Sequence, residues 1–354
     1  MYLILTDKCN LGCKYCFADS SFPYNYKTGS MTWETAHHAF EFFKHNVDRS
    51  YIPDIWFYGG EPFLESELLF NLANYISINE PSFSMTVISN GTLITPEIAQ
   101  QIKAYPNINI TVSVDGAKEI HDANRVYKNG NGSFEAVERG IACPRQAGVP
   151  FGISCTIGTT NVEYTFETIQ WLHEHFGTTN IGTNFLVDTP RQFVTEDYIH
   201  RANQGLIKFF KNYREGSVTE NRFLRKIDTF VSGKPRWQDC SACGGQIVIS
   251  PDGQIGICHE GLGERHTFVG SLWDKNFDFY NNPTVNEWAM HSPINQEECL
   301  SCPALAVCGG GCPYGAMLKY GSIWNIDRRF CIHSKEALEW LIWDLYDKVL
   351  ERLS

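Results

Sequence analysis

Cysteine is the residue type that dominates the chemistry open to this sequence, because eleven of its thirteen cysteines fall into two groups with the spacing of metal ligands. Three of them, Cys9, Cys13 and Cys16, stand near the N-terminus as C-x3-C-x2-C. The other eight lie in the last third of the chain, at Cys240, Cys243, Cys258, Cys299, Cys302, Cys308, Cys312 and Cys331. A four-iron cube takes four thiolates, so eight cysteines can close two cubes and three leave one iron open. We therefore expect three [4Fe–4S] clusters, with reaction chemistry at the open iron.

The segment Cys9-Asn-Leu-Gly-Cys13-Lys-Tyr-Cys16-Phe resembles the cluster loop of the radical S-adenosylmethionine (SAM) enzymes. The later cysteines resemble the SPASM extension of one branch of that family, because C-x2-C-x5-C-x3-C is followed by a final distant cysteine. The resemblance covers nearly the whole chain. It implies a fold of the α/β class, a partial (β/α)6 barrel of the TIM type followed by a Cys-rich SPASM domain. It also implies that SAM binds at the open iron as a second cofactor.

The elements that must position these cysteines follow from the hydrophobic pattern. Short apolar runs alternate with amphipathic stretches over residues 1 to about 190, which predicts parallel strands connected by helices. Thr32, Thr95 and Ser133 stand where the first helical turns need capping side chains. The expected strands contain Tyr2–Leu5, Ile55–Tyr58, Met85–Ser89, Ile110–Val114, Gly152–Ile157 and Ile181–Val187.

Three regions are expected along the chain: a barrel over residues 1–195, a helical bridge over 196–236 and the SPASM domain over 237–354. The bridge begins with a predicted helix over 196–215, and the chain closes with a predicted helix over 334–353. The closing helix has an apolar stripe that we expect to pack in the core. The stripe consists of Leu338, Leu341, Ile342 and Leu345.

Polar motifs follow the expected strands, and the carboxyl ends of parallel strands meet at one rim of such a fold. Gly59-Gly60-Glu61-Pro62 follows the second run and resembles the glycine–glycine–glutamate segment of the family. That resemblance implies close approach of the backbone at Gly59 and Gly60, and contact of the Glu61 carboxylate with the SAM ammonium. An ordinary turn is the alternative interpretation of this segment.

Four further residues match SAM-binding positions of the family. The resemblance implies that Tyr15 contacts the adenine and that Ser113 and Arg125 contact the ribose and the methionine carboxylate. The guanidinium of Arg125 suits a carboxylate because it can donate two parallel hydrogen bonds. Asn90 would add polar contacts. A helix cap or a turn is the structural alternative for the serine and the asparagine.

The resemblance assigns the later cysteines to two auxiliary clusters in a crosswise manner. The first cluster would be held by Cys240, Cys243, Cys258 and Cys312. The second would be held by Cys299, Cys302, Cys308 and Cys331. Where sulfatase maturases have a basic aspartate just after the third auxiliary cysteine, this chain has His259 and Glu260, our candidates for the general base. A role as donor to the cluster sulfur is the alternative.

Other interpretations of the cysteines remain open. The N-terminal trio could bind zinc with His37 or His38, and the C-x2-C pair could form a zinc ribbon. A disulfide framework suits short secreted chains, whereas this chain has 354 residues, 43% of them hydrophobic. Cys143 and Cys155 fall outside the pattern, and we expect them to pack as buried thiols.

Charge and hydropathy limit the partners. A formal net charge of −11 argues against a nucleic-acid partner. Residues 200–236 are locally basic, which indicates either a solvated surface or a dock for an acidic peptide. No apolar run could cross a membrane and no signal peptide precedes the first strand, so we expect no membrane partner and a cytoplasmic location.

The sequence therefore favours a radical SAM/SPASM maturase of a ribosomally made peptide, which would form a thioether or a carbon–carbon cross-link. The expected partners are a precursor peptide and a low-potential electron donor of the flavodoxin or ferredoxin type. Because the sequence starts directly with the first strand, a separate protein could serve to bind the leader. The alternatives are an anaerobic sulfatase-maturating enzyme and, in a different class, a non-catalytic iron–sulfur electron carrier.

Overall fold

The computed structural model describes residues 1–18, 29–188, 194–216 and 218–353, which fall into two compact units. The first unit comprises Met1–Ser154 and Gly245–Asn286, and the second comprises Cys155–Gly244 and Glu287–Ser354. The expected boundaries at residues 195 and 236 separate the barrel, the bridge and the SPASM domain. They stay predictions. Within the described residues, none of the helices is long and apolar enough to cross a membrane.

The first unit is built on a sheet whose strands run in the order β10-β9-β8-β1-β2-β3-β4-β5. Strands β1 to β5 are parallel, β8 runs parallel to β1, and β8, β9 and β10 are joined in antiparallel fashion. The strands are β1 (Tyr2–Thr6), β2 (Asp54–Gly59), β3 (Ser84–Ser89), β4 (Ile108–Ser113), β5 (Phe151–Ile157, which extends into the second unit), β8 (Val248–Ile249), β9 (Gln254–Gly256) and β10 (Phe268–Ser271).

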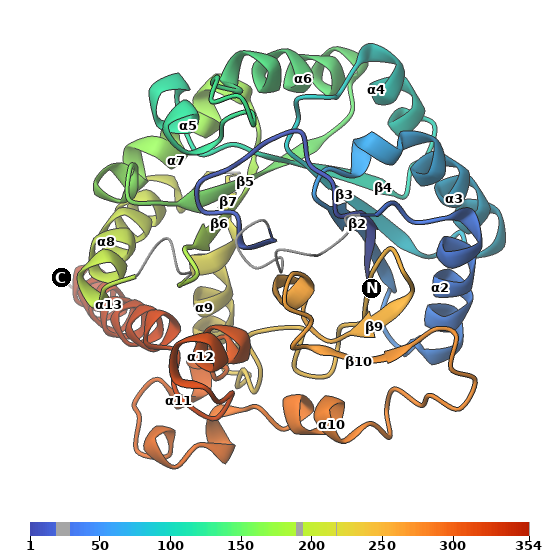
Figure 1. Cartoon of the computed structure of the whole chain (residues 1–354). Helices are drawn as coiled ribbons and strands as arrows, with labels where there is room; N and C mark the ends of the chain where they lie inside the picture. Colours follow the sequence, from blue (N-terminus) through green and yellow to red (C-terminus); the bar gives the residue numbers. More distant parts are fainter. Residues whose placement is uncertain (19–28, 189–193, 217, 354) are drawn as a thin grey trace. The chain divides into compact units, whose positions relative to one another are not determined.

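The helices of this unit follow the parallel strands one by one, and Figure 1 shows them outside the strands. They are α2 (Trp33–Asn46), α3 (Ser66–Asn79), α4 (Pro96–Lys103), α5 (Lys118–Asn124) and α6 (Phe134–Ala147); α10 (Pro283–Ala289) crosses into the second unit. Thr32 and Thr95 cap α2 and α4 as predicted, because their hydroxyls accept hydrogen bonds from Thr35 N and Ile98 N. The alternation of parallel strands and helices confirms the expected α/β class.

Ser133 precedes α6 as predicted but does not cap it. Its hydroxyl donates to Arg125 O at 2.8 Å and lies 3.0 Å from His121 Nε2. The first amide of the helix, Phe134 N, is instead satisfied by Asp122 Oδ1 at 2.8 Å. Ser133 therefore marks the start of α6 as predicted, but its hydroxyl bonds to Arg125 O instead of the first helical turn.

Burial between the sheet and its helices anchors the strand ends that carry the polar motifs. Leu3 and Leu5 on β1, Phe57 on β2 and Phe40 on α2 are fully buried. Burying one such side chain contributes about 1.5–3 kcal/mol. The apolar runs are therefore fixed in the sheet, and the segments after each run leave it at defined points.

The second unit is mainly helical. Its elements are α7 (Thr165–Phe176), β6 (Asn180–Phe185), α8 (Glu196–Tyr213), β7 (Thr219–Glu220), α9 (Asn221–Ser232), α11 (Leu305–Cys308), α12 (Pro313–Tyr320) and α13 (Arg328–Leu353). Strands β6 and β7 pair in parallel. Helix α8 packs against α13, where Arg214 forms a two-pronged ion pair with Asp344.

Two predictions about the helices of this unit need correction. Helix α13 begins at Arg328, six residues before the predicted start at Ser334, so the predicted ligand Cys331 lies in its first turn. Its apolar stripe is only partly core, because Leu341 is buried whereas Ile342 and Leu345 are 50% and 51% exposed. The buried face of α13 runs through His333, Ala337 and Leu341, four residues apart, and Ile342 and Leu345 lie outside it.

Candidate functional site

The N-terminal cysteines lie in the loop that leaves β1, and the doublet Gly59-Gly60 at the end of β2 lies directly against this loop. Gly60 N donates to Thr6 O at 2.8 Å, and Glu61 N donates to Lys8 O at 2.9 Å. Gly59 has a φ of +141°, and a Cβ atom at Gly60 would lie 2.1 Å from Lys8 O. Only glycine permits this approach, so the doublet holds the backbone just before Cys9.

The carboxylate of Glu61 is buried at the end of this doublet and is largely occupied by its own protein. Oε1 accepts from Phe63 N at 3.1 Å and from Ser89 Oγ at 2.8 Å, and Oε2 accepts from Asn90 N at 2.7 Å. Burial raises the pKa of Glu61 to about 7, against these three bonds. Glu61 therefore fastens the end of β2 to the end of β3, and its expected contact with the SAM ammonium stays a prediction.

Asn90, another expected SAM contact, also bonds within the chain. Its Nδ2 donates to Asn10 Oδ1 at 2.8 Å and lies 3.8 Å from Cys9 Sγ, and its Oδ1 accepts from Thr92 N at 3.0 Å. Asn10 Nδ2 completes the network by donating to Thr92 Oγ1 at 2.8 Å. Asn90 thus connects the cluster loop to β3 and offers an N–H donor to a ligand sulfur.

A buried charge pair lies beside the second cysteine of the loop. Arg125 Nε is 3.1 Å from Asp115 Oδ2, the same oxygen that accepts the Tyr15 hydroxyl at 2.5 Å. The guanidinium carbon lies 5.3 Å from the centre of the Tyr15 ring. Burial raises the pKa of Cys13 to about 12, and Arg125 is the leading opposing influence. A cation next to this thiol favours its thiolate form, which is the form that binds metal.

The pair leaves part of Arg125 available. Its Nε faces Asp115, and the guanidinium also carries two terminal nitrogens that can donate hydrogen bonds. Ser113 is the last residue of β4, two residues before Asp115. Both expected SAM contacts thus lie close in sequence to Asp115, one at the end of β4 and one after it.

The candidate bases His259 and Glu260 lie in a short 3-10 helix over His259–Leu262, beside the same cluster loop. The ring of His259 stacks on Tyr2 at 4.2 Å and lies 6.2 Å from Phe17, which follows Cys16. Burial lowers the pKa of His259 to about 4, so its imidazole is neutral near pH 7. This packing holds the ring rigidly, and its role as a base stays a prediction.

The second candidate, Glu260, lies near the buried side chain of Tyr58. The pKa of Tyr58 is raised by burial first, and then by Cys16 and Glu260. Glu260 therefore lies within electrostatic reach of the hydroxyl that faces the cluster loop. Its role as a base also stays a prediction.

In the second unit, the four cysteines predicted for the second auxiliary cluster line one cavity. Cys299, Cys302, Cys308 and Cys331 border an empty space of about 350 Å³, counted up to the surrounding atoms and including its opening. Short turns bring them together, since Cys302 N donates to Cys299 O at 3.0 Å and Cys331 N donates to Asp327 O at 3.2 Å. Thiols spread around a shared space fit a cube, which takes one thiolate for each iron.

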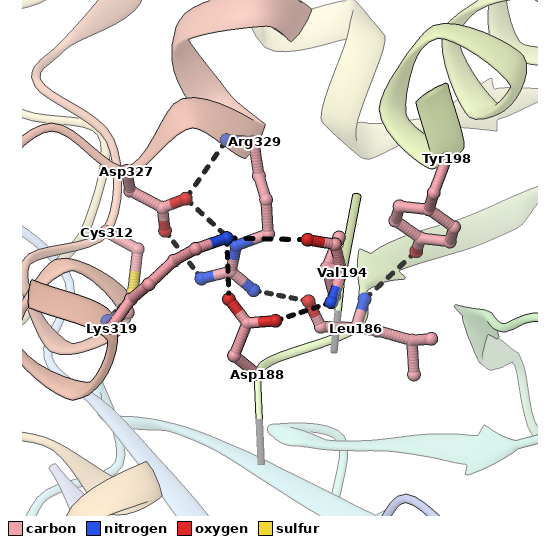
Figure 2. Close-up of polar contacts among 9 residues, drawn as sticks. Leu186, Asp188, Val194, Tyr198, Cys312, Lys319, Asp327 and Arg329 are labelled. Atoms are coloured by element: carbon pink, nitrogen blue, oxygen red, sulfur yellow. Dashed lines mark hydrogen bonds and ion pairs between the residues drawn. The ribbon is translucent and has the colours of Figure 1, made fainter. Parts of the chain in front are cut away.

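One lining residue of this cavity, Asp327, belongs to a buried ion pair with Arg329 (Figure 2). Asp327 lines the cavity, and the Arg329 guanidinium grips its carboxylate with Nε at 2.9 Å and Nη2 at 2.5 Å. Arg329 Nη1 donates to Leu186 O, just after β6, at 2.5 Å. Close by, Asp188 accepts from Val194 N and pairs with Lys319 at 3.2 Å. The wall is thereby fixed to the end of β6.

The first auxiliary quartet is only partly placed together. Cys240, Cys243 and Cys312 belong to the second unit and Cys258 to the first, so the quartet stays a prediction. Cys243 Sγ lies 3.9 Å from His291 Nδ1, and Gly315 N donates to Cys312 Sγ at 3.3 Å. Hydrogen bonds to sulfur of this kind are usual around metal-bound thiolates.

The remaining predictions concern a zinc site and the two cysteines outside the pattern. Over the described ranges, no three His, Cys, Asp or Glu side chains converge on a position that could hold a single metal ion. Cys155 is buried as expected, whereas Cys143 is partly exposed and lies 3.4 Å from Arg139 O.

Much of the basic stretch is already neutralised by acids of its own unit, which favours the solvated-surface interpretation over the peptide dock. The pairs are Arg201 with Glu163 and Asp197, Lys208 with Glu167, Arg214 with Asp344, and Lys226 with Asp239.

Sequence reasoning missed several residues of these sites. Asp115 stands between two predicted contacts, and its position after a strand could have singled it out as a carboxylate partner for Arg125. Asn10 lies inside the cluster loop itself. Asp327 and Arg329 carry no spacing signal, because a wall is made by residues that meet only in the folded chain.

Comparison with known proteins adds three findings to this geometry. Residues 3–176 match the family described as the radical SAM superfamily. Protein MJ0907 of Methanocaldococcus jannaschii is 31% identical over 78% of this chain and 89% of its own length. The radical SAM cyclopropyl synthase TigE of Paramaledivibacter caminithermalis is 23% identical over 99% of this chain and 73% of its own length. The solved structure of native anSMEcpe with bound AdoMet and Cp18Cys peptide aligns with a TM-score of 0.81 and 21% sequence identity, covering 100% of this chain and 99% of that one.

Proposed function

This chain belongs to the radical SAM superfamily, and on that premise we propose that it modifies a ribosomally made precursor peptide through hydrogen abstraction. The product would carry a thioether or a carbon–carbon cross-link. The observation that carries this proposal is the three-thiol loop at Cys9, Cys13 and Cys16, with the buried Arg125 guanidinium beside Cys13. When bound, a [4Fe–4S] cluster and SAM supply a 5′-deoxyadenosyl radical after transfer of one electron.

The residues around the loop divide the binding work in this proposal. The three thiolates hold three irons and leave the fourth for SAM. Arg125 receives the methionine carboxylate on its terminal nitrogens, while Asp115 keeps the guanidinium in place through Nε. Tyr15, Gly59, Gly60 and Ser113 remain the proposed neighbours of the rest of SAM. Glu61 is also proposed to contact the SAM ammonium and Asn90 to add polar contacts, and both fix the strand ends on which the site depends.

Two auxiliary clusters complete the proposed cofactor set, for a total of three. The cavity lined by Cys299, Cys302, Cys308 and Cys331 supports the second of them. Because each auxiliary quartet would be fully ligated by protein, we assign them to electron transfer rather than to substrate binding. The proposed partners are an external electron donor of the flavodoxin or ferredoxin type and, where needed, a separate leader-binding protein. The proposed location of the chain is the cytoplasm.

Two features favour a peptide as the substrate. The solved relative of the same fold was captured with a peptide and AdoMet, and the relative TigE is named as a synthase of cyclopropyl groups, which requires formation of a carbon–carbon bond. Formylglycine formation on a sulfatase is the second candidate. It is less favoured, because His259 and Glu260 stand where that class has an aspartate, and His259 is enclosed by aromatic rings.

The test is an anaerobic assay of the reconstituted full-length chain with SAM, a low-potential reductant and the precursor encoded beside it. We expect 5′-deoxyadenosine and a product that has lost two hydrogen atoms, as mass spectrometry would show. The Cys13→Ala variant should produce neither, and the Cys143→Ser variant, which changes a thiol outside the pattern, should produce both. An aldehyde on a sulfatase peptide would support the second candidate, and equal nucleoside release by Cys13→Ala would refute radical chemistry at this loop.

A further inference from the structure

Helix α9 turns basic side chains inward, although the sequence places them in a stretch that looks like a solvated surface. Arg222 and Lys226 are one helical turn apart and are 7% and 1% exposed. The Arg222 guanidinium lies over the Phe185 ring at 4.6 Å and donates through Nε to Thr183 O. Arg222 is thereby occupied at the end of β6, and Lys226 is the cation of this face that reaches the cysteine-bearing segments.

Lys226 joins two of these segments. Its Nζ lies 3.0 Å from Asp239 Oδ1 and 2.9 Å from Cys308 O, and the Lys226 and Asp239 side chains are 2% and 4% exposed. Asp239 directly precedes Cys240. The same segments are also joined through the backbone, since Asp239 N donates to Gly309 O at 2.8 Å. A lysine buried this deeply is costly unless its charge is compensated, so its position calls for a reason.

The pair is oriented with respect to the cysteines. Its positive end touches the backbone of Cys308, a member of the quartet that lines the cavity. Its negative end belongs to the residue before Cys240.

Two other cations act on the carboxylate end of the pair. Arg225 Nη1 lies 3.4 Å from Asp239 O, and Arg222, whose guanidinium lies over the Phe185 ring, also acts electrostatically on Asp239. His333 is buried nearby and is bonded through Nδ1 to Asn203 Oδ1 at 2.7 Å. Burial and the neighbouring Lys226 and Arg222 keep its pKa well below the usual value, so it stays neutral.

We propose that the buried Lys226–Asp239 pair raises the reduction potential of the Cys308 site, because the Lys226 ammonium favours an added electron there. This inference rests on the proposed function, because it takes these cysteines as cluster ligands. An added electron makes a site more negative, so a nearby buried cation stabilises it and a nearby anion destabilises it. Water and salt screen such a buried pair only weakly.

The consequence is a better electron acceptor in the second unit. The Cys308 site would be reduced by one electron from the low-potential donor of the proposed function, which is oxidised, with no proton transferred. Lys226 is a positioning residue in this scheme, because it acts through its charge on a group that the cysteines hold. A purely structural role, in which the pair only joins the two segments, predicts no effect on potentials.

The experiment is a redox titration of the reconstituted full-length chain, followed by electron paramagnetic resonance. The Cys9, Cys13 and Cys16 positions are changed to alanine so that only auxiliary signals remain. Adding Cys331→Ala identifies the signal of the Cys308 site, because that signal disappears. The variants compared in this background are Lys226→Met, Lys226→Arg and the double variant Lys226→Met with Asp239→Asn, with Lys208→Met as a control at an exposed ion pair.

We expect Lys226→Met to lower the reduced fraction of the Cys308 site at least tenfold at a fixed potential, which is about 59 mV for one electron. Lys226→Arg should keep the wild-type value, and Lys208→Met should change nothing. The double variant leaves no stranded charge, so it keeps the test valid if Lys226→Met fails to hold iron. It should lower the potential of the Cys308 site in the same direction as Lys226→Met, by a smaller amount.

Unchanged potentials in Lys226→Met and in the double variant, with full iron content, would overturn the inference and leave the proposed function intact. Absence of auxiliary iron from the unsubstituted quartets would instead overturn the ligand assignment in the proposed function, and the inference with it. The two failures are therefore distinguished by the iron content of the parent chain. Melting curves of the metal-free variants report the structural contribution of the pair separately.

Discussion

The cluster loop in the first unit and the cysteine-lined cavity in the second unit both present cysteine thiols, but they differ in the number of thiols and in the side chains around them. The loop offers three thiols and is surrounded by side chains from other strand ends, including Asn90 and Arg125, which present donors. The cavity offers four thiols, and the acidic residue on its wall, Asp327, is already gripped by Arg329. The number of thiols and the availability of neighbouring donors thus separate a site that receives a ligand from one that is closed.

The largest expected effect comes from replacing one cysteine in each of the two sites. Cys9→Ala should reduce formation of 5′-deoxyadenosine at least about 1,000-fold, roughly 4 kcal/mol, because the cluster that binds SAM loses one of its three ligands. Cys302→Ala should leave nucleoside formation within a few fold and prevent formation of the cross-linked peptide. The measurement is nucleoside and peptide product from the same anaerobic reaction. Equal nucleoside yields from the two variants would remove the distinction between the sites.

The next effect concerns stability and tests the buried carboxyl of the first site. Burial raises the pKa of Glu61 from 4.5 to about 7, so the folded state binds this proton more tightly than the unfolded state. Its contribution is fully present below pH 4.5 and is lost as pH rises through 7, by up to about 3 kcal/mol. Urea unfolding of the metal-free chain between pH 4.5 and 8 measures this change.

The Glu61→Gln variant should lack this part of the pH dependence, whatever its absolute stability. Glu34→Gln, at an exposed position on α2, is the control and should keep the wild-type slope. Parallel profiles for the wild type and Glu61→Gln would show that another group controls this range.

A smaller effect is expected from Arg125→Lys. Lysine keeps the charge but cannot present two parallel donors to a carboxylate while its neighbour Asp115 stays paired. We expect the KM for SAM to rise roughly 10- to 100-fold, or about 1.5–3 kcal/mol, with a smaller change in kcat. Arg139→Lys on the exposed side of α6 is the matched control. An unaltered KM would place the SAM carboxylate elsewhere.

The smallest effect should come from the donor next to Cys9. Asn90→Ala removes the amide that lies 3.8 Å from Cys9 Sγ and bonds Asn10. One such hydrogen bond contributes about 1 kcal/mol, so turnover should fall about fivefold and the potential of the N-terminal cluster should decrease. Asn79→Ala, on the exposed side of α3, should match the wild type. A decrease in both variants alike would point to general destabilisation.

The sequence contained enough information for the strands and for the loop that carries the first cysteines. The expected strands lie where the structure has β1 to β6, because alternating burial leaves a periodic record in the residues themselves. Glycine at Gly59 and Gly60 was also interpretable, since their function depends on the absence of a side chain.

Bonding partners and the direction of charged side chains were not predictable in the same way. The bonds of the Glu61 carboxylate to Phe63 N and Ser89 Oγ could not be predicted from the sequence, and its expected contact with SAM stays a prediction. Lys226 was counted as part of a solvated stretch, yet it is buried against Asp239. The residue type does not reveal whether a charged side chain points inward or outward, because this direction depends on the packing of segments that are distant in the sequence.

The close approach at Gly60 has a practical consequence for anyone who wishes to redesign the enzyme. A methyl group there would have to displace the main chain of Lys8, and the ligand that follows it would shift as well. Libraries intended to broaden the range of products should therefore leave this doublet untouched. They can diversify the outward-facing positions of the helices, where a larger side chain disturbs no iron-binding backbone.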